Sequence, residues 1–128
     1  MTACQLCLRK PITACLRLTA LLCALALPAA AADLAKGPDI TAAITGNTVQ
    51  GTMSGGAAYT EYYDADGTIR GDGYTGQWAV EGDTMCFTYG TDPATCHGVG
   101  IVQGQVSWYL DGAVVGTGML AEGNPNGW

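Results

Sequence analysis

From Asn47 onward the chain alternates between short apolar runs and turn signals. The runs are rich in Val, Thr, Tyr, Trp and Ile, and Gly or Asp-Gly recurs about every 8 to 12 residues, which is typical of an all-β domain. Connections this short leave no room for crossover helices, so neighbouring strands must be antiparallel. The pattern predicts strands at residues 48–53, 58–63, 68–71, 74–81, 84–89, 95–103, 105–110 and 113–120.

Alternation within the runs predicts which side chains face a core. Trp78 shares one face of its strand with Tyr74, Gly76 and Val80, and Trp108 repeats this arrangement. Together the runs predict an antiparallel up-and-down meander of about eight strands, curled into a sheet or small barrel, with a two-sheet sandwich as the alternative. Ahead of the strands, residues 38–45 predict a short helix with Pro38 in its first turn and Gly46 as the stop.

The first 32 residues have a different pattern. A basic lead precedes the apolar run at residues 18–27, and Pro28 and four alanines follow it. This order predicts a secretory signal peptide cleaved between Ala32 and Asp33, since ten apolar residues are too few to span a bilayer. We therefore expect an exported protein, periplasmic or secreted, without a stable membrane anchor after cleavage. Its parts are a leader and helix at 33–46, one β domain at 47–123 and a tail at 124–128.

Removal of the signal changes the charge and cysteine count. Lys36 and Arg70 then stand as two basic residues against eleven acidic ones, a net charge of −9. Such a chain is poorly suited to nucleic acid or anionic lipid. Cys86 and Cys96 remain, and an isolated pair in an oxidising compartment predicts a disulfide.

Motifs for cofactors are weak, and we expect none. The acidic turn at residues 64–68 fails the EF-hand pattern at both ends, and an Asp-Gly hairpin turn explains it better. Cys96-His97 lacks the haem-attachment spacing, because nine residues rather than two separate its cysteines. His97 is the sole histidine, and no serine lies in a nucleophile motif beside it, so we assign no catalytic residue.

The aromatic residues suggest a binding role. Tyr59 and Tyr63 share a strand face with Glu61, so this face and His97 form the candidate binding surface, where exposed rings beside carboxylates can stack on a ligand. An inward Tyr74 or Tyr89 hydroxyl can also anchor a ligand inside a barrel. Ordinary core and cross-strand pairing is the alternative for all of these rings.

One longer pattern is familiar. The segments GNTVxG from Gly46, EYYxxDG from Glu61 and YxGxWxVxGDxxCF from Tyr74, followed by Cys96, resemble a group of small exported proteobacterial proteins classed as a domain of unknown function. The resemblance spans residues 40–123 and implies a periplasmic address and a disulfide, but no catalytic residues.

These observations favour a non-enzymatic binding or accessory protein of the periplasm. The partner would be a small ligand or an exported protein. A protein-interaction module, such as an inhibitor of an exported enzyme that uses residues 33–37 or the tail, is the second hypothesis. A small hydrolase that uses His97 and the acidic residues is the third.

Overall fold

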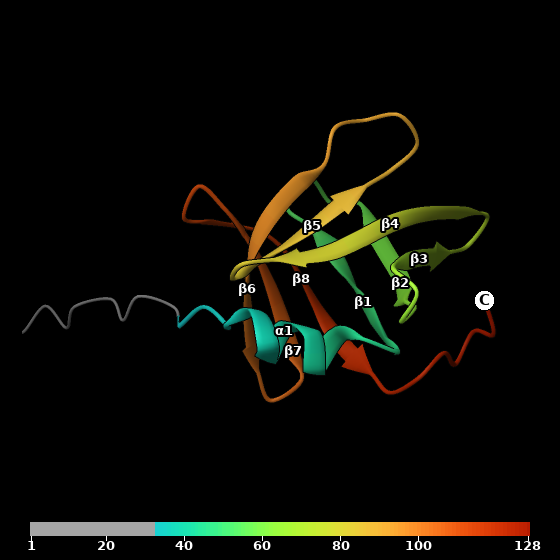
Figure 1. Cartoon of the computed structure of the whole chain (residues 1–128), viewed down its shortest axis with the longest axis horizontal. Helices are drawn as coiled ribbons and strands as arrows, with labels where there is room; N and C mark the ends of the chain where they lie inside the picture. Colours follow the sequence, from blue (N-terminus) through green and yellow to red (C-terminus); the bar gives the residue numbers. More distant parts are fainter. Residues whose placement is uncertain (1–32) are drawn as a thin grey trace, which may run out of the picture. The chain divides into compact units, whose positions relative to one another are not determined.

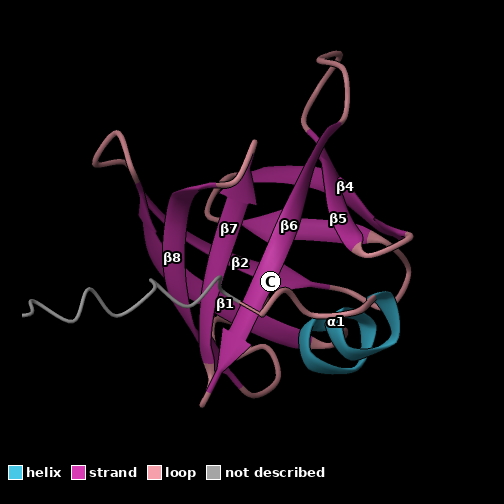
Figure 2. Cartoon of the chain, turned by 90° about the vertical axis from the view of Figure 1, so that its left-hand side faces the viewer, coloured by secondary structure: helices cyan, strands magenta, loops and turns pink. Residues whose placement is uncertain are grey.

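The computed structural model describes residues 33–128, and the predicted signal peptide lies outside these residues. Helix α1 and eight strands follow one another along the described chain (Figures 1 and 2). The bounds are α1 Gly37–Ile44, β1 Asn47–Met53, β2 Ala58–Tyr63, β3 Thr68–Gly71, β4 Tyr74–Glu81, β5 Thr84–Thr88, β6 Thr95–Val102, β7 Gln105–Leu110 and β8 Ala113–Ala121. Every predicted strand is present, with ends that differ by at most one residue, and the predicted helix begins and ends one residue earlier.

The strands form a closed antiparallel barrel in which each pairs with the next. Six residue pairs between β1 and β8, from Thr48↔Ala121 to Met53↔Gly116, close it. The meander and small barrel are therefore confirmed, and the sandwich alternative is wrong. Closure leaves no exposed sheet edge, so every strand has a hydrogen-bonded neighbour on both sides.

Because successive strands run in opposite directions, alternate turns lie at the same end of the barrel. Residues 64–67, 82–83 and 103–104 connect strands at the end that α1 adjoins. The opposite end carries the connections 54–57, 72–73, 89–94 and 111–112. Figure 1 shows α1 and the connection 89–94 on opposite sides of the barrel.

Helix α1 covers its end of the barrel with two isoleucines. Ile40 and Ile44 are fully buried, and the helix contacts β1, β4 and β5. Its first turn is fixed by Asp83, whose Oδ1 accepts a hydrogen bond from the Gly37 N–H at 2.8 Å. The Gly37 backbone also lies so close to the Gly82 carbonyl that a side chain at position 37 would collide with it. An eight-residue helix, too short to be stable alone, is thus held by its contacts with the barrel.

Aliphatic side chains fill the barrel next to this helix. Val49, Ile69, Met85, Val99 and Val106 each expose none of their surface. They point inward from five strands and meet Ile40 and Ile44 in one cluster. This packing is the main source of hydrophobic stabilisation.

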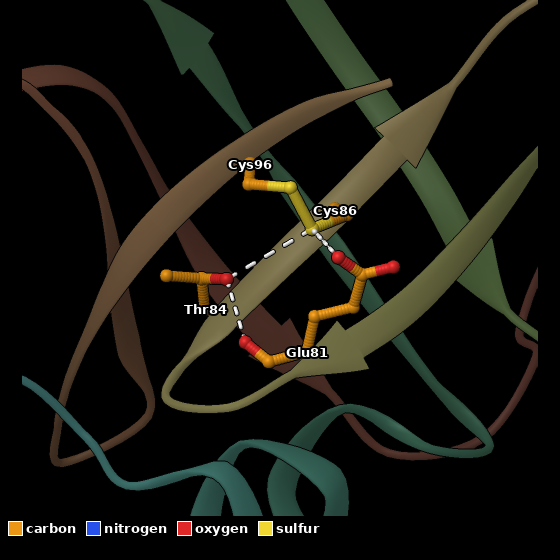
Figure 3. Close-up of a disulfide and its surroundings, with 4 residues drawn as sticks. All are labelled: Glu81, Thr84, Cys86 and Cys96. Atoms are coloured by element: carbon orange, nitrogen blue, oxygen red, sulfur yellow. Dashed lines mark hydrogen bonds between the residues drawn. A yellow bond between two sulfur atoms is a disulfide. The ribbon is translucent and has the colours of Figure 1, made fainter.

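A disulfide joins the outer faces of β5 and β6. It links Cys86 to Cys96, as predicted. The two residues are direct cross-strand partners, and their Cα atoms are 3.9 Å apart. Figure 3 shows the bond together with Glu81 and Thr84, whose hydroxyl donates to the Glu81 carbonyl at 2.8 Å. Among the described residues there is no helix with the length and hydropathy needed to cross a membrane.

Candidate ligand cavity at the open end of the barrel

The end of the barrel opposite α1 contains a cavity of about 390 Å³. Its walls come from β1, β2, β5, β6 and β7 and from three residues of the connection 89–94, of which Asp92 and Pro93 lie at the mouth. The lining residues are Met53, Tyr59, Glu61, Tyr63, Phe87, Tyr89, Asp92, Pro93, Thr95, His97 and Trp108. The interior of an eight-stranded barrel is either filled by side chains or just wide enough to hold one small ligand.

A single carboxylate lies among these aromatic walls. Glu61 lies in the middle of β2 and is only 6% exposed, which is unusual for a charged side chain. Its Oε1 accepts hydrogen bonds from the Tyr74 and Tyr89 hydroxyls, each at 2.8 Å, and its Oε2 accepts one from Tyr63 at 2.8 Å. A carboxylate has about four acceptor positions, so three donors satisfy most of them and leave one on Oε2.

Two glycines allow distant tyrosines to reach Glu61. Tyr74 opens β4, and its ring lies against the Gly71 backbone, where any Cβ would overlap the ring. Tyr89 follows β5, and a Cβ on Gly76 would come within 2.8 Å of its ring. Larger residues at positions 71 and 76 would displace these rings, so the glycines are part of the construction of the site.

The environment of Glu61 also acts on its tyrosine partners. Burial, followed by the Glu61 charge, raises the pKa of Tyr63 and Tyr89 well above that of a free tyrosine. The pKa of Tyr74 is raised by burial and by its hydrogen bond to Glu61. These hydroxyls therefore remain protonated, and remain donors, throughout the physiological pH range.

A second group of contacts links Tyr59 to Trp108 and Phe87 in the cavity wall. Trp108 Nε1 donates to the Tyr59 hydroxyl at 2.8 Å, and that hydroxyl donates to the Thr117 carbonyl at 3.1 Å. Phe87 packs edge-on against Trp108, with ring centroids 5.3 Å apart, and against Tyr63 at 6.2 Å. Aromatic rings with fixed positions therefore line most of the cavity.

His97 completes the lining. Its ring packs against Phe87 with centroids 5.4 Å apart, and its Nδ1 is buried without a hydrogen-bond partner. Burial lowers the pKa of His97 below its usual value, so the imidazole is neutral at pH 7. An unpaired buried polar atom is unfavourable, and a ligand able to hydrogen-bond there would relieve that cost.

The four residues of the predicted binding surface, Tyr59, Glu61, Tyr63 and His97, all line this cavity. The expectation that their face is an exposed patch is wrong, because Tyr63 is 1% exposed and Glu61 is 6% exposed. As predicted, Tyr59, Glu61 and Tyr63 share one face of β2, but in the closed barrel this face points inward. No sequence motif singles out Asp92 and Pro93, which lie at the mouth of the cavity.

The acidic residues singled out in the sequence at 64–66 and at Glu81 have structural surroundings that explain them. Asp64 and Asp66 form ion pairs with Arg70 at 3.1 and 3.5 Å. Asp66 Oδ1 also accepts the Thr68 backbone N–H at 2.8 Å, which is the hydrogen bond of an aspartate turn. Glu81 lies beside Cys86 and Cys96, but both sulfur atoms are used in the disulfide and neither is a thiolate ligand.

The two basic side chains of residues 33–128 lie elsewhere. Arg70 is paired with Asp64 and Asp66, and Lys36 Nζ is 3.4 Å from Asp83 beside α1. Neither lines the cavity. Within the part of the chain that the structure describes, the Glu61 carboxylate is thus stabilised by neutral hydroxyls and not by an ion pair.

Comparison of the chain with protein-family models, with curated proteins and with solved structures gives no match.

Proposed function

We propose that this protein is an exported, non-enzymatic binding protein that holds one small organic molecule inside its barrel. The observation that carries the proposal is the cavity at the open end, with Glu61 buried at its base between three tyrosine hydroxyls. Pockets with mostly apolar walls and a few convergent polar groups are typical of small-molecule sites.

Several features favour binding over catalysis. A nucleophile–histidine mechanism needs a base held by hydrogen bonds on both sides, whereas His97 Nδ1 has no partner. Ser107 pairs with Gly100 and Thr117 on neighbouring strands and does not line the cavity. The groups around Glu61 are arranged to fix a carboxylate in place.

The C-terminal tail offers less support for a role as an inserted inhibitory segment. Asn124 accepts the Gly127 and Trp128 backbone N–H groups on its side-chain oxygen, at 3.1 and 3.2 Å, and its amide donates to the Trp128 carbonyl. These contacts curl residues 124–128 into a closed turn. A segment that inserts into a partner would first have to break them.

The test is fluorescence titration with 1-aminoanthracene, an uncharged aromatic dye that brightens in apolar sites, using protein expressed from the full chain. We expect saturable binding that Thr95→Trp abolishes, because Thr95 lines the cavity and tryptophan would fill it. Val102→Trp is the matched control, since Val102 lies on the same strand and is 67% exposed outside the barrel. Absence of dye binding, or equal binding by the Thr95→Trp variant, would contradict the proposal.

A further inference from the structure

The charge balance of the cavity identifies the class of ligand. Glu61 lies at its base and Asp92 at its mouth, and no Lys or Arg is among the lining residues. Both basic side chains of residues 33–128 are already paired with other carboxylates. The cavity therefore contains negative charge without a positive counterpart from the described chain.

The hydrogen bonds at Glu61 are all of the kind that a carboxylate accepts. All three tyrosines donate to it, and a carboxylate is the form that accepts only. Hydroxyl donors reduce the cost of burying this charge, but they do not neutralise it. A buried charge is stabilised most by an opposite charge at close range, because the local dielectric constant is low.

The walls favour the same kind of ligand. Tyr59, Tyr89 and Trp108 line the cavity together with Phe87. The face of an aromatic ring carries negative electrostatic potential, and rings around a pocket bind organic ammonium groups by cation–π attraction. An anion would instead be repelled by Glu61 and by any ring face that it contacts.

One acceptor on Glu61 remains for N–H donors, and His97 Nδ1 is a second one in the tautomer that carries its proton on Nε2. One acceptor position on Glu61 Oε2 is unused by the protein, and His97 Nδ1 is buried without a partner. A primary or secondary ammonium carries two or more N–H groups and can use such acceptors, which a quaternary ammonium cannot.

We propose that the ligand is a small organic ammonium, with an apolar or aromatic body among the rings and its charged nitrogen at Glu61. This inference rests on the proposed binding function and adds the identity of the head group. Asp92 at the mouth would attract the cation during entry.

The test compares three probes that share a phenyl body and differ in head-group charge: 2-phenylethylamine, 2-phenylethanol and phenylacetate. Each displaces 1-aminoanthracene from protein expressed from the full chain at pH 7, where the amine is protonated. We expect the amine to bind at least about tenfold more tightly than the alcohol, equivalent to about 1.4 kcal/mol, and phenylacetate to bind weakest.

The variant Glu61→Gln keeps the size of the side chain and removes its charge, so the preference for the amine over the alcohol should disappear. Glu81→Gln removes one charge from the exposed outer face of β4 and should leave the preference unchanged. If Glu61→Gln does not fold, the order of the three probe affinities for the unmodified protein still tests the ammonium proposal.

The outcomes separate the two proposals. Dye binding with equal or tighter binding of the alcohol or phenylacetate would overturn the ammonium assignment and leave the binding function intact. A preference that persists in Glu61→Gln would also overturn it. Absence of dye binding would overturn both, and dye that none of the three probes displaces would overturn the ammonium assignment alone.

Discussion

The two ends of the barrel are built from different side chains. The end that α1 covers is filled with aliphatic residues that expose no surface, such as Ile44, Val49 and Val106. The open end is lined by aromatic rings, a buried carboxylate and a histidine with an unpaired nitrogen. A carboxylate and unpaired polar atoms do not add to stability as apolar packing does. The comparison indicates that the closed end stabilises the fold, and the open end is where we propose that the ligand binds.

The largest effect is expected when the closed end is weakened. Ile44→Ala removes a fully buried side chain under α1 and should lower the free energy of unfolding by about 2–5 kcal/mol. Urea denaturation measures this loss. Val102→Ala, on the exposed outer face, should change stability by less than about 0.5 kcal/mol. If folded Ile44→Ala protein no longer bound 1-aminoanthracene, the two ends would not be separable.

The disulfide is expected to contribute somewhat less. Replacing both Cys86 and Cys96 with serine opens a link between residues ten positions apart and should cost about 2–3 kcal/mol, because the unfolded chain regains entropy. Hydrogen exchange should quicken most in β5 and β6, the strands that the bond joins. Unchanged stability after reduction of the unmodified protein would show that cross-strand pairing alone holds this hairpin.

Alkaline pH should act on the open end through its tyrosines. Above about pH 10 the tyrosines of the unfolded chain lose their protons, while Tyr63, Tyr74 and Tyr89 keep theirs in the folded protein because their pKa values are raised. The unfolded state then binds fewer protons, so the free energy of unfolding falls as pH rises beyond 10. Absorbance at 295 nm, a phenolate band, follows the ionisation.

Glu61→Gln removes the negative charge that raises these pKa values, so its tyrosines should ionise at lower pH than those of the unmodified protein. Glu81→Gln is again the control. Identical titration curves for Glu61→Gln and the unmodified protein would mean that burial alone controls the tyrosines.

The smallest effect is expected at mildly acidic pH from His97. Its pKa is lowered in the folded state, so below about pH 6.5 the unfolded chain takes up a proton that the folded protein does not. The free energy of unfolding should therefore fall as pH decreases through this range, down to the folded-state pKa. The titratable groups that share its cavity are Glu61, Asp92 and three tyrosines. His97→Asn should remove this part of the pH dependence. If the free energy of unfolding of this variant falls with the same slope, the dependence comes from the carboxylates.

The sequence predicted local structure better than closure. Alternating residues and Asp-Gly turns defined the eight strands, because side-chain period and turn chemistry are local properties. The β1–β8 pairing joins residues about 70 positions apart, such as Thr48 and Ala121, and the same alternation suits a sandwich. Closure depends on curvature summed over all strands, which no single segment encodes.

The candidate site was also predictable only in its local features. Alternation predicts that Tyr59, Glu61 and Tyr63 share one face of their strand, but it does not show whether that face points into the barrel or to solvent. The available signal was the pairing of small and large residues: Gly71 and Gly76 make space for Tyr74 and Tyr89, whose hydroxyls meet at Glu61. Recognising it requires the register between strands, which the sequence alone does not provide.

The most direct measurement is an NMR titration of the protein with 2-phenylethylamine, observing the side-chain signals of Trp108, His97 and the methyl group of Met53. We predict saturable shifts at these three residues, which line the open end, and Overhauser contacts between the probe's ring and Trp108. Signals from Ile40 and Ile44 at the closed end should not move. Shifts confined to the outer face, or none up to about 10 mM probe, where the binding free energy is below about 3 kcal/mol, would contradict a recognition site inside the barrel.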